Sequence, residues 1–413
     1  MIDTKHLPNY SPELCLLISC LRLSLNRNAD YESLSGCGKE IDWDHFFQLL
    51  ERHRCTLQVY PVLKRLGRQC VPDNVLDRLK MHVRRKTTLA MAKAGTLLCL
   101  AKQFDCENIP FLPIKGPVLA LQAYGGVGAR SMKDLDILVA PERISDAQEL
   151  LFRMGYKRTQ PDFELTPRQT AEAFRNQHHF SYHHPDSGEQ IELHWRFGSN
   201  RHLFPICFEE LWKERQVLQF AGLDIPVLPL HHTLLLLCTH GTNHHWFRLF
   251  WLNDLARLVC ANDGVNWGSL TACAARLGLE RMLAEGMLLC SLLFDLPIPD
   301  PVRCYAATDR GTLKITRIAL ELIGRVEEPV YYRPHSKAYV LSKLHSAMIR
   351  KDLGYRVSLL LAHLNAPYPD WKRVSIPDRF FIFYYLLRPI FWLERMYLSR
   401  GDVCGKKEPA ERP

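Results

Sequence analysis

Several classes of protein can be set aside because the sequence lacks their signatures. Its 14 cysteines are scattered and form no CxxC pair, so a disulfide framework is not expected. The first residues show no basic region followed by a long apolar core, which argues against a secretory signal. No uninterrupted run of about eighteen or more apolar residues occurs, so no membrane-spanning helix is expected. These absences predict a cytoplasmic protein with free thiols.

Three kinds of catalytic motif are missing as well. No G-x-S-x-G occurs and no cysteine stands in a recognisable nucleophile setting, so acyl transfer has no support. The glycines at 125, 126 and 128 are not followed by the GK[ST] of a P-loop, and we interpret them as a flexible loop. His240 and His244 have the spacing of a zinc-binding pair, but the glutamate of H-E-x-x-H is absent.

What is present is the composition of an ordinary globular protein. Of 413 residues, 47% are hydrophobic and 23% are charged, and the length favours two or three domains. The formal charge is +9, from 53 Lys and Arg against 44 Asp and Glu. Such a balance suits an anionic partner, whether nucleotide, nucleic acid or acidic lipid, but it does not choose among them and gives no firm indication of nucleic acid.

The periodicity of apolar residues divides the chain into three parts. Residues 1–109 repeat apolar side chains at helical spacing, as at Leu16, Leu17 and Cys20, and predict a helical N-terminal domain. Residues 110–229 mix strand and helix patterns, and residues 230–413 return to helical patterning. The predicted fold class is therefore α+β, with a small mixed β-sheet flanked by helical domains at both ends.

The middle part begins with an apolar run at 111–114, which ends at Lys115-Gly116 before a helix that Pro117 can open. Residues 134–139 alternate with period two, which predicts a strand carrying Asp134 and Asp136 on one face, roughly 6 to 7 Å apart along the backbone. A helix over 141–154, a strand over 156–159 and a strand pair over 217–228 are also expected.

A hairpin is predicted from residues 178–184 and 190–197, with its turn at 185–188. The second arm alternates cleanly and places Glu192, His194 and Arg196 on one face. Because side chains alternate along a strand, only half of the histidines of the first arm can face one site. We interpret them as solvated edge residues; they are His178, His179, His183 and His184.

Paired carboxylates on one strand, with a third on another strand, suit the binding of Mg²⁺ or Mn²⁺ against a triphosphate. Asp134 and Asp136 are accordingly predicted as catalytic metal ligands. Glu192 either binds the metal as well or acts as the base toward an acceptor hydroxyl, and the sequence leaves both roles open.

Nearby basic residues are candidates for binding the nucleotide. Lys115 and Gly116 stand at a strand-to-helix turn, where the backbone can approach phosphate and an ammonium is at hand, although an ordinary turn would look the same. Arg130 and Lys133 precede the acidic pair and could reach triphosphate oxygens, or they could be solvated loop charges.

Further candidates lie in the carboxy-terminal part of the chain. His240, His244 and Asp254, together with His194, are expected to line a nucleotide or acceptor pocket, although Asp254 could instead pair with Arg257. The aromatic stretch at 380–398 could be an interfacial membrane element, but a helix packed on the domain core is the favoured interpretation.

Three stretches of the chain resemble a known family. The runs IKGPVLALQAYG, R-x-x-x-DLDILV and IELHW look like the nucleotidyltransferase superfamily related to DNA polymerase beta, in its poorly characterised bacterial branch. Trp43, His53 and the run THGTNHHWFRLFWLNDLARLV are similar to recurrent features of that branch. In it, lysine-glycine stands where better known relatives carry the glycine-serine that helps to hold the triphosphate, so Lys115 and Gly116 either replace that pair or the nucleotide sits differently.

The resemblance implies a small mixed sheet with helices on one side, so that residues 110–229 would be the nucleotidyltransferase core. It also implies transfer of a nucleoside monophosphate from a triphosphate, with ATP among the candidates, to a hydroxyl on a small molecule, glycan precursor or peptide product. Two alternatives remain open: a catalytically inactive nucleotide-binding or scaffold protein, and an enzyme that nucleotidylates proteins.

Overall fold

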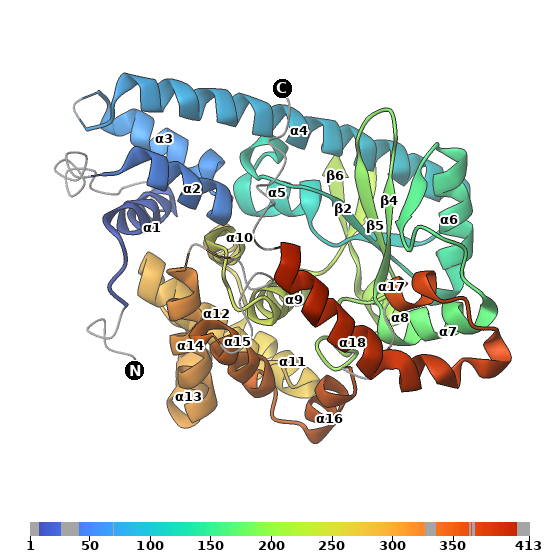
Figure 1. The fold of residues 1–413 in the computed structure, drawn as a ribbon. Helices are drawn as coiled ribbons and strands as arrows, with labels where there is room; N and C mark the ends of the chain where they lie inside the picture. Colours follow the sequence, from blue (N-terminus) through green and yellow to red (C-terminus); the bar gives the residue numbers. More distant parts are fainter. Residues whose placement is uncertain are drawn as a thin grey trace.

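A small mixed sheet and a larger assembly of helices make up the computed structural model, which describes residues 8–25, 41–68, 70–325, 327, 336–362, 365 and 368–402 (Figure 1). The five-stranded sheet has the order β1-β2-β5-β4-β3, and a separate hairpin contains two further strands. The strands are β1 (Phe111–Pro113), β2 (Leu135–Val139), β3 (Lys157–Gln160), β4 (His179–His183), β5 (Gln190–His194), β6 (Gln216–Phe220) and β7 (Leu223–Val227). The predicted α+β class is confirmed.

The sheet is mixed because β2 runs parallel to β5, whereas the β1-β2, β5-β4 and β4-β3 pairs are antiparallel. One face is apolar: Ile137, Leu193 and Tyr182 are almost fully buried there. They share a core with residues of α4 (Asp73–Cys106) and α6 (Ile144–Arg153). Since strand side chains alternate between faces, the polar residues between these apolar ones lie on the opposite face.

The long helix α4 joins the two cores of the molecule. Its 34 residues extend for about 51 Å at the rise of an α-helix. Val75 and Leu79, near its beginning, belong to the core of the helical assembly, whereas Leu97 and Leu100 pack beneath the sheet. Figure 1 shows α4 running along one side of the molecule, from the amino-terminal helices to the sheet.

The helical assembly combines both ends of the chain. Its amino-terminal helices are α1 (Pro12–Leu25), α2 (Trp43–His53) and α3 (Thr56–Leu66). They share one apolar core with α9 (Leu230–Asn243), α10 (Leu249–Cys260), α11 (Trp267–Leu277), α12 (Glu280–Phe294), α13 (Asp300–Thr308) and α14 (Arg310–Ile323). The division into domains at 1–109, 110–229 and 230–413 stays a prediction, since packing groups the first and third parts together.

The remaining helices connect or cover these units. They are α5 (Gly116–Tyr124), α7 (Pro167–Asn176), α8 (Phe208–Glu214), α15 (Lys337–Met348), α16 (Leu353–Leu361), α17 (Tyr368–Arg373) and α18 (Ile382–Asp402), with short 3-10 turns η4 (Val127–Ala129), η5 (Pro141–Arg143) and η7 (Asp378–Phe380). Local sequence fixes where several begin: Thr166 and Gln169 form a reciprocal capping box at α7, as expected for these residue types.

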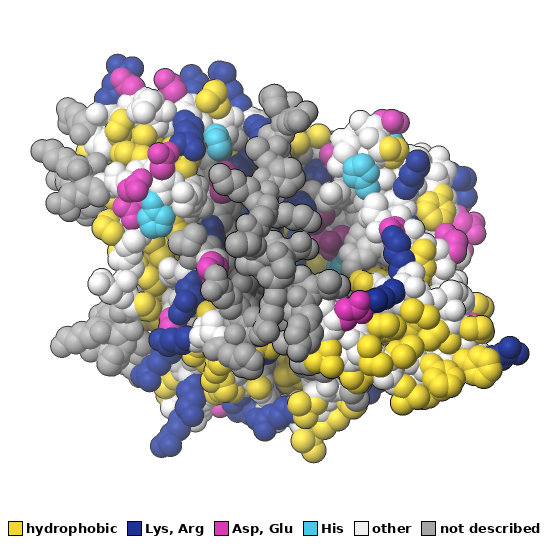
Figure 2. Space-filling view, viewed as in Figure 1, with side chains coloured by type: hydrophobic (Ala, Val, Ile, Leu, Met, Phe, Trp, Pro, Cys, Tyr) yellow, Lys and Arg dark blue, Asp and Glu magenta, His cyan; other side chains and the backbone are white. Residues whose placement is uncertain are grey.

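The segment at 380–398 falls mainly on α18 and has two sides. Phe381 and Tyr384 are buried in the core of the sheet unit, whereas Ile382, Leu386 and Ile390 are exposed. Figure 2 shows apolar side chains gathered in the lower right of this face, where Figure 1 places the beginning of α18. The side chains at 392 and 395–400 lie outside the described residues. Among the helices that the structure describes, none combines the length and apolar character needed to cross a membrane.

Candidate functional site

Acidic residues gather on the polar face of the sheet, because the strand register brings them together. Asp136 on β2 is the direct neighbour of Glu192 on β5 in the parallel pair. Asp134 immediately precedes β2, two residues before Asp136, and therefore lies on the same face of the sheet. The sequence predicted this grouping from two separate stretches, and the pairing of β2 with β5 produces it.

His194 lies two residues beyond Glu192 and joins this cluster. Its Nε2 is 3.3 Å from Asp136 Oδ1 and also 3.3 Å from Glu192 Oε2. One potential ligand atom from each of these three residues lies within 4.8 Å of the other two. The Asp136 side chain is 16% exposed and that of Glu192 is 29% exposed, so both are sheltered but reachable.

The charged groups in this cluster shift one another's pKa values. Burial, together with repulsion from Asp136 and Glu192, raises the pKa of Asp134 to about 6. Burial would also raise the pKa of Asp136, but a hydrogen bond from His194 and the charge of Lys115 outweigh it and hold that pKa well below its usual value. Burial opposes protonation of His194, yet its hydrogen bonds to Asp136 and Glu192 raise the pKa of the imidazole to about 9. The protein alone therefore leaves concentrated negative charge only partly compensated.

Lys115 and Gly116 stand where β1 gives way to α5. Gly116 has φ +61°, a left-handed conformation that favours glycine, and it forms the first residue of the helix. The Lys115 ammonium is 2.9 Å from His240 Nδ1. Burial lowers the pKa of Lys115 below its usual value, although the charge of Asp136 works in the opposite direction. The lysine is thus placed between the acidic cluster and α9.

His240 and His244 form a neutral wall opposite the sheet. Their ring centroids are 4.7 Å apart, and each lies 5.1 to 5.2 Å from the ring of Trp251. Burial and the nearby Lys115 charge lower the pKa of His240 well below its usual value, and the same causes lower that of His244 to about 4. A neutral His240 can accept a hydrogen bond from Lys115, which is the arrangement observed.

Arg130 and Asp254 pair with each other. The Arg130 guanidinium donates to both Asp254 oxygens, at 2.7 to 3.1 Å, and Tyr124 Oη donates to the same carboxylate at 2.6 Å. Asp254 is 0% exposed and is not among the residues that line the cleft, so it lies behind the cleft wall. Arg257, the alternative partner suggested for it, instead donates to Ser24. The pair accounts for the buried charge of Arg130 without a nucleotide, and contact of Arg130 with triphosphate stays a prediction.

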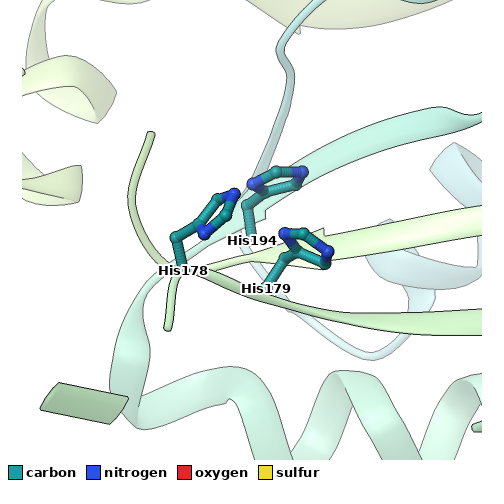
Figure 3. Close-up of side chains that lie close together, drawn as sticks. All are labelled: His178, His179 and His194. Carbon is teal, nitrogen blue, oxygen red and sulfur yellow. The ribbon is translucent and has the colours of Figure 1, made fainter. Parts of the chain in front are cut away.

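His178 and His179 differ from the expectation for solvated edge residues. The β4-β5 register sets His179 directly opposite His194, and the centroids of these two rings are 4.9 Å apart. The ring of His178 is 4.3 Å from that of His179, and Figure 3 shows the three rings gathered on one side of the strands. The missed signal was the hairpin turn: a turn at 185–188 fixes which residue of one arm faces which residue of the other.

A cleft of about 2010 Å³ connects these groups, between the polar sheet face, α4 and α9. It is larger than the roughly 300–1,000 Å³ typical of small-molecule sites, so it has room for a nucleotide and a second substrate. Eleven Lys and Arg but only five Asp and Glu line it, an excess that suits an anionic ligand. Exposed Lys133 is among these residues, as are Lys115, Gly116, His194, His240 and His244.

The donor set fits a hard divalent cation. Asp134, Asp136 and Glu192 offer carboxylate oxygens, the ligands that Mg²⁺ and Mn²⁺ prefer, and their mutual repulsion would be relieved by a cation. Because these carboxylates line a basic cleft, a cation held by them would lie beside any polyanion bound there. What the arrangement offers chemically is therefore metal-assisted reaction at a phosphate.

Comparison with known proteins identifies the family of the chain. No curated protein and no solved structure matches it. The family model described as uncharacterised nucleotidyltransferase matches residues 39–295, a span that contains the sheet, Lys115, the acidic cluster and the histidine wall. The resemblance seen in the sequence is thereby confirmed, and the chain belongs to this family of nucleotidyltransferases.

Proposed function

We propose that this chain transfers a nucleoside monophosphate from a nucleoside triphosphate, with ATP as a candidate, to a hydroxyl acceptor. The family match supports a general nucleotidyl transfer activity. The observation that carries the more specific proposal is the meeting of Asp134, Asp136 and Glu192 on one sheet face beside a basic cleft. Two parts of the chain, with Asp136 and Glu192 56 residues apart, supply these carboxylates.

In this proposal Asp134, Asp136 and Glu192 hold Mg²⁺ or Mn²⁺. The bound cation would supply charge neutralisation of the phosphate oxygens and of the charge that develops during transfer. Lys115, at the start of α5, binds phosphate oxygens through its ammonium and shifts between His240 and the nucleotide. Gly116 leaves the backbone accessible there, and Lys133 adds a cation at the cleft rim.

The transfer itself requires a base for one proton. The acceptor oxygen forms a bond to the α-phosphorus, the bond from that phosphorus to the β-bridging oxygen breaks, and pyrophosphate leaves with the bonding electron pair. The hydroxyl proton must pass to a neighbouring group. Glu192 is the more exposed of the two paired carboxylates, and it is our candidate for that base if Asp134 and Asp136 suffice to hold the cation.

The test uses the purified full chain, each α-labelled triphosphate with Mg²⁺ or Mn²⁺, and a cell extract as the source of acceptor. Asp136→Asn should lower transfer by at least about 100-fold, because the loss of a ligand exceeds the 10- to 100-fold effects of residues that only orient ligands. Exposed Asp263→Asn, which makes the same chemical change away from the cleft, is the control. Undiminished transfer by Asp136→Asn refutes the assignment.

The same assay separates the alternatives. A catalytically inactive binder would retain the labelled triphosphate without turnover, and an enzyme that nucleotidylates proteins would move the label into high-mass products. Resolving the products by mass therefore distinguishes these two functions from transfer to a small molecule, a glycan precursor or a peptide.

Contact of residues 380–398 with a membrane surface is also part of the proposal. Exposed Ile382, Leu386 and Ile390 recur at helical spacing on α18, as in helices that lie at a lipid interface. Sedimentation of the full chain with anionic vesicles is the test. Recovery of all the protein in the supernatant would refute the membrane contact.

A further inference from the structure

Three imidazole rings meet beside the acidic cluster. His178 and His179 enter β4 as neighbours in the chain, and His194 ends β5 directly opposite His179. Their ring centroids are separated by 4.3, 4.9 and 5.5 Å. One ring nitrogen from each residue lies within 4.8 Å of the other two, and Figure 3 shows the rings gathered around a common space.

Hydrogen bonding within the protein satisfies this group only in part. His178 Nδ1 is 2.9 Å from Ser199 Oγ, and His194 Nε2 lies between Asp136 and Glu192. His179 Nδ1 is buried and has no hydrogen-bond partner among the residues that the structure describes. An unpaired buried polar atom is unfavourable, so His179 has a ring nitrogen that a ligand could use.

We propose that His178, His179 and His194 form a binding site for a divalent transition-metal ion of the Zn²⁺ class. Imidazole nitrogen is a preferred ligand of such ions, whereas Mg²⁺ prefers oxygen. With Zn–N distances of about 2.0–2.1 Å, two ligands of a tetrahedral ion stand roughly 3.4 Å apart. The nitrogens of this cluster already lie within 4.8 Å of one another, so small side-chain rotations would bring them to that spacing.

The surroundings of the cluster support this assignment. His194 bonds to Asp136 and Glu192, and carboxylates that bond to a ligating histidine fix its orientation at metal sites. Ser199 holds the His178 ring in the same way. All three histidines line the large cleft, so an ion can enter from solvent.

This inference goes beyond the proposed nucleotidyl transfer, because the histidine site requires no nucleotide. The polar face of the sheet would then carry two kinds of metal site, one with mainly oxygen ligands and one with mainly nitrogen ligands. His194 lies between them. Transition-metal binding by the histidines can therefore be measured whether or not the carboxylates support transfer.

Co²⁺ is the probe, because its visible absorption reports the number and kind of its ligands. The full chain, free of nucleotide, is titrated with Co²⁺, and bound Co²⁺ is then displaced with Zn²⁺. Loss of a ligand in His179→Gln or His178→Gln should weaken binding by at least about tenfold, the lower limit for residues that merely orient ligands. His183→Gln, at the other end of the same strand and outside the cluster, should bind Co²⁺ as the unchanged chain does.

A second group of potential ligands must be distinguished from this site. His231, His232 and Cys273 also have ligand atoms within 4.8 Å of one another. Coordination by the Cys273 thiolate would add an intense sulfur-to-cobalt charge-transfer band, and Cys273→Ser would abolish it. Absorption that lacks this band and persists in Cys273→Ser is expected for the three-histidine site.

Two results would overturn the proposal: no Co²⁺ binding by the unchanged chain, or binding that survives both His178→Gln and His179→Gln. Circular dichroism of each variant shows that it is folded before its titration is interpreted. Asp134→Asn distinguishes a failure of the proposed transfer from a failure of the proposed histidine site. It should abolish transfer and retain Co²⁺ binding at the histidines. Loss of transfer would then say nothing against the histidine site.

Discussion

Removing the charge of Asp254 should destabilise the whole protein. Asp254 on α10 is 0% exposed, and it accepts three hydrogen bonds from Arg130 and one from Tyr124. Arg130 is itself only 4% exposed. In Asp254→Asn the Tyr124 hydroxyl keeps an acceptor, but the guanidinium remains buried without a counter-charge. The pair also connects the helical assembly to the loop that leads into Asp134, so both parts of the molecule depend on it.

The expected loss is about 3–5 kcal/mol of unfolding free energy, the range for breaking one side of a buried ion pair. An exposed pair provides the comparison: Arg153 and Glu107 also approach to 2.7 Å, but their side chains are 54% and 47% exposed. Solvent screening reduces the contribution of such a pair, and Glu107→Gln should cost only about 0–1 kcal/mol. The two substitutions make the same chemical change at the same distance, and burial is what differs.

Urea unfolding followed by circular dichroism measures both variants. With a slope near 3 kcal/mol per M, Asp254→Asn should lower the midpoint by about 1 M or more. Changing both partners, Arg130→Met with Asp254→Leu, should recover most of the loss because no unpaired charge remains. A midpoint for Asp254→Asn equal to that of Glu107→Gln would refute the reasoning.

Three other predictions concern single contacts. Gly241→Ala would push a methyl group into the Trp246 ring, and this overpacking should lower the unfolding free energy by about 1–3 kcal/mol in the same urea assay. An unchanged midpoint would contradict the tight packing of α9 against Trp246. The methyl group of Gly116→Ala would make only an ordinary contact, 3.5 Å from Leu135, but the residue must adopt φ +61°. The substitution should therefore cost about 1 kcal/mol of unfolding free energy and reduce nucleotide affinity, measured by calorimetry with a non-hydrolysable triphosphate. Equal affinity would contradict a role of Gly116 in nucleotide binding. Burial opposes ionisation of Asp309, but hydrogen bonds from Arg281 and Thr312 hold its pKa well below the usual 3.8. The contribution of this carboxylate to stability is therefore fully present above about pH 4 and is lost as the pH falls further. Asp309→Asn should make the urea midpoint less sensitive to acid below pH 4, and an unchanged dependence on pH would contradict this.

Local patterns in the sequence were sufficient for much of the fold and for the centre of the site. Alternation over residues 134–139 and 190–194 placed Asp134, Asp136 and Glu192 on strand faces, since a period of two is a property of the backbone itself. The turn at Lys115-Gly116 was also found from local sequence, because an apolar run ends there and Pro117 suits the first turn of a helix. The resemblance to nucleotidyltransferases rested on these same stretches, and the family match confirmed it.

Contacts between distant parts of the chain could not be predicted in this way. Arg130 and Asp254 are 124 residues apart, and their pairing follows from the packing of α10 against α5. Lys115 meets His240 across 125 residues for a related reason, since α9 and the sheet line the same cleft. Periodicity tells which face a side chain occupies, but it does not tell which other face will be packed against it.

The sequence by itself determined the α+β class, the strands of the middle part, the strand faces that carry the carboxylates, and the family. Only the tertiary structure decided that the two ends of the chain share one core, that Arg130 turns to Asp254, and that His178 and His179 join His194. The physical reason is that burial and register are properties of the assembled molecule. A histidine at a strand edge is solvated or a metal ligand according to what the neighbouring strand sets opposite it.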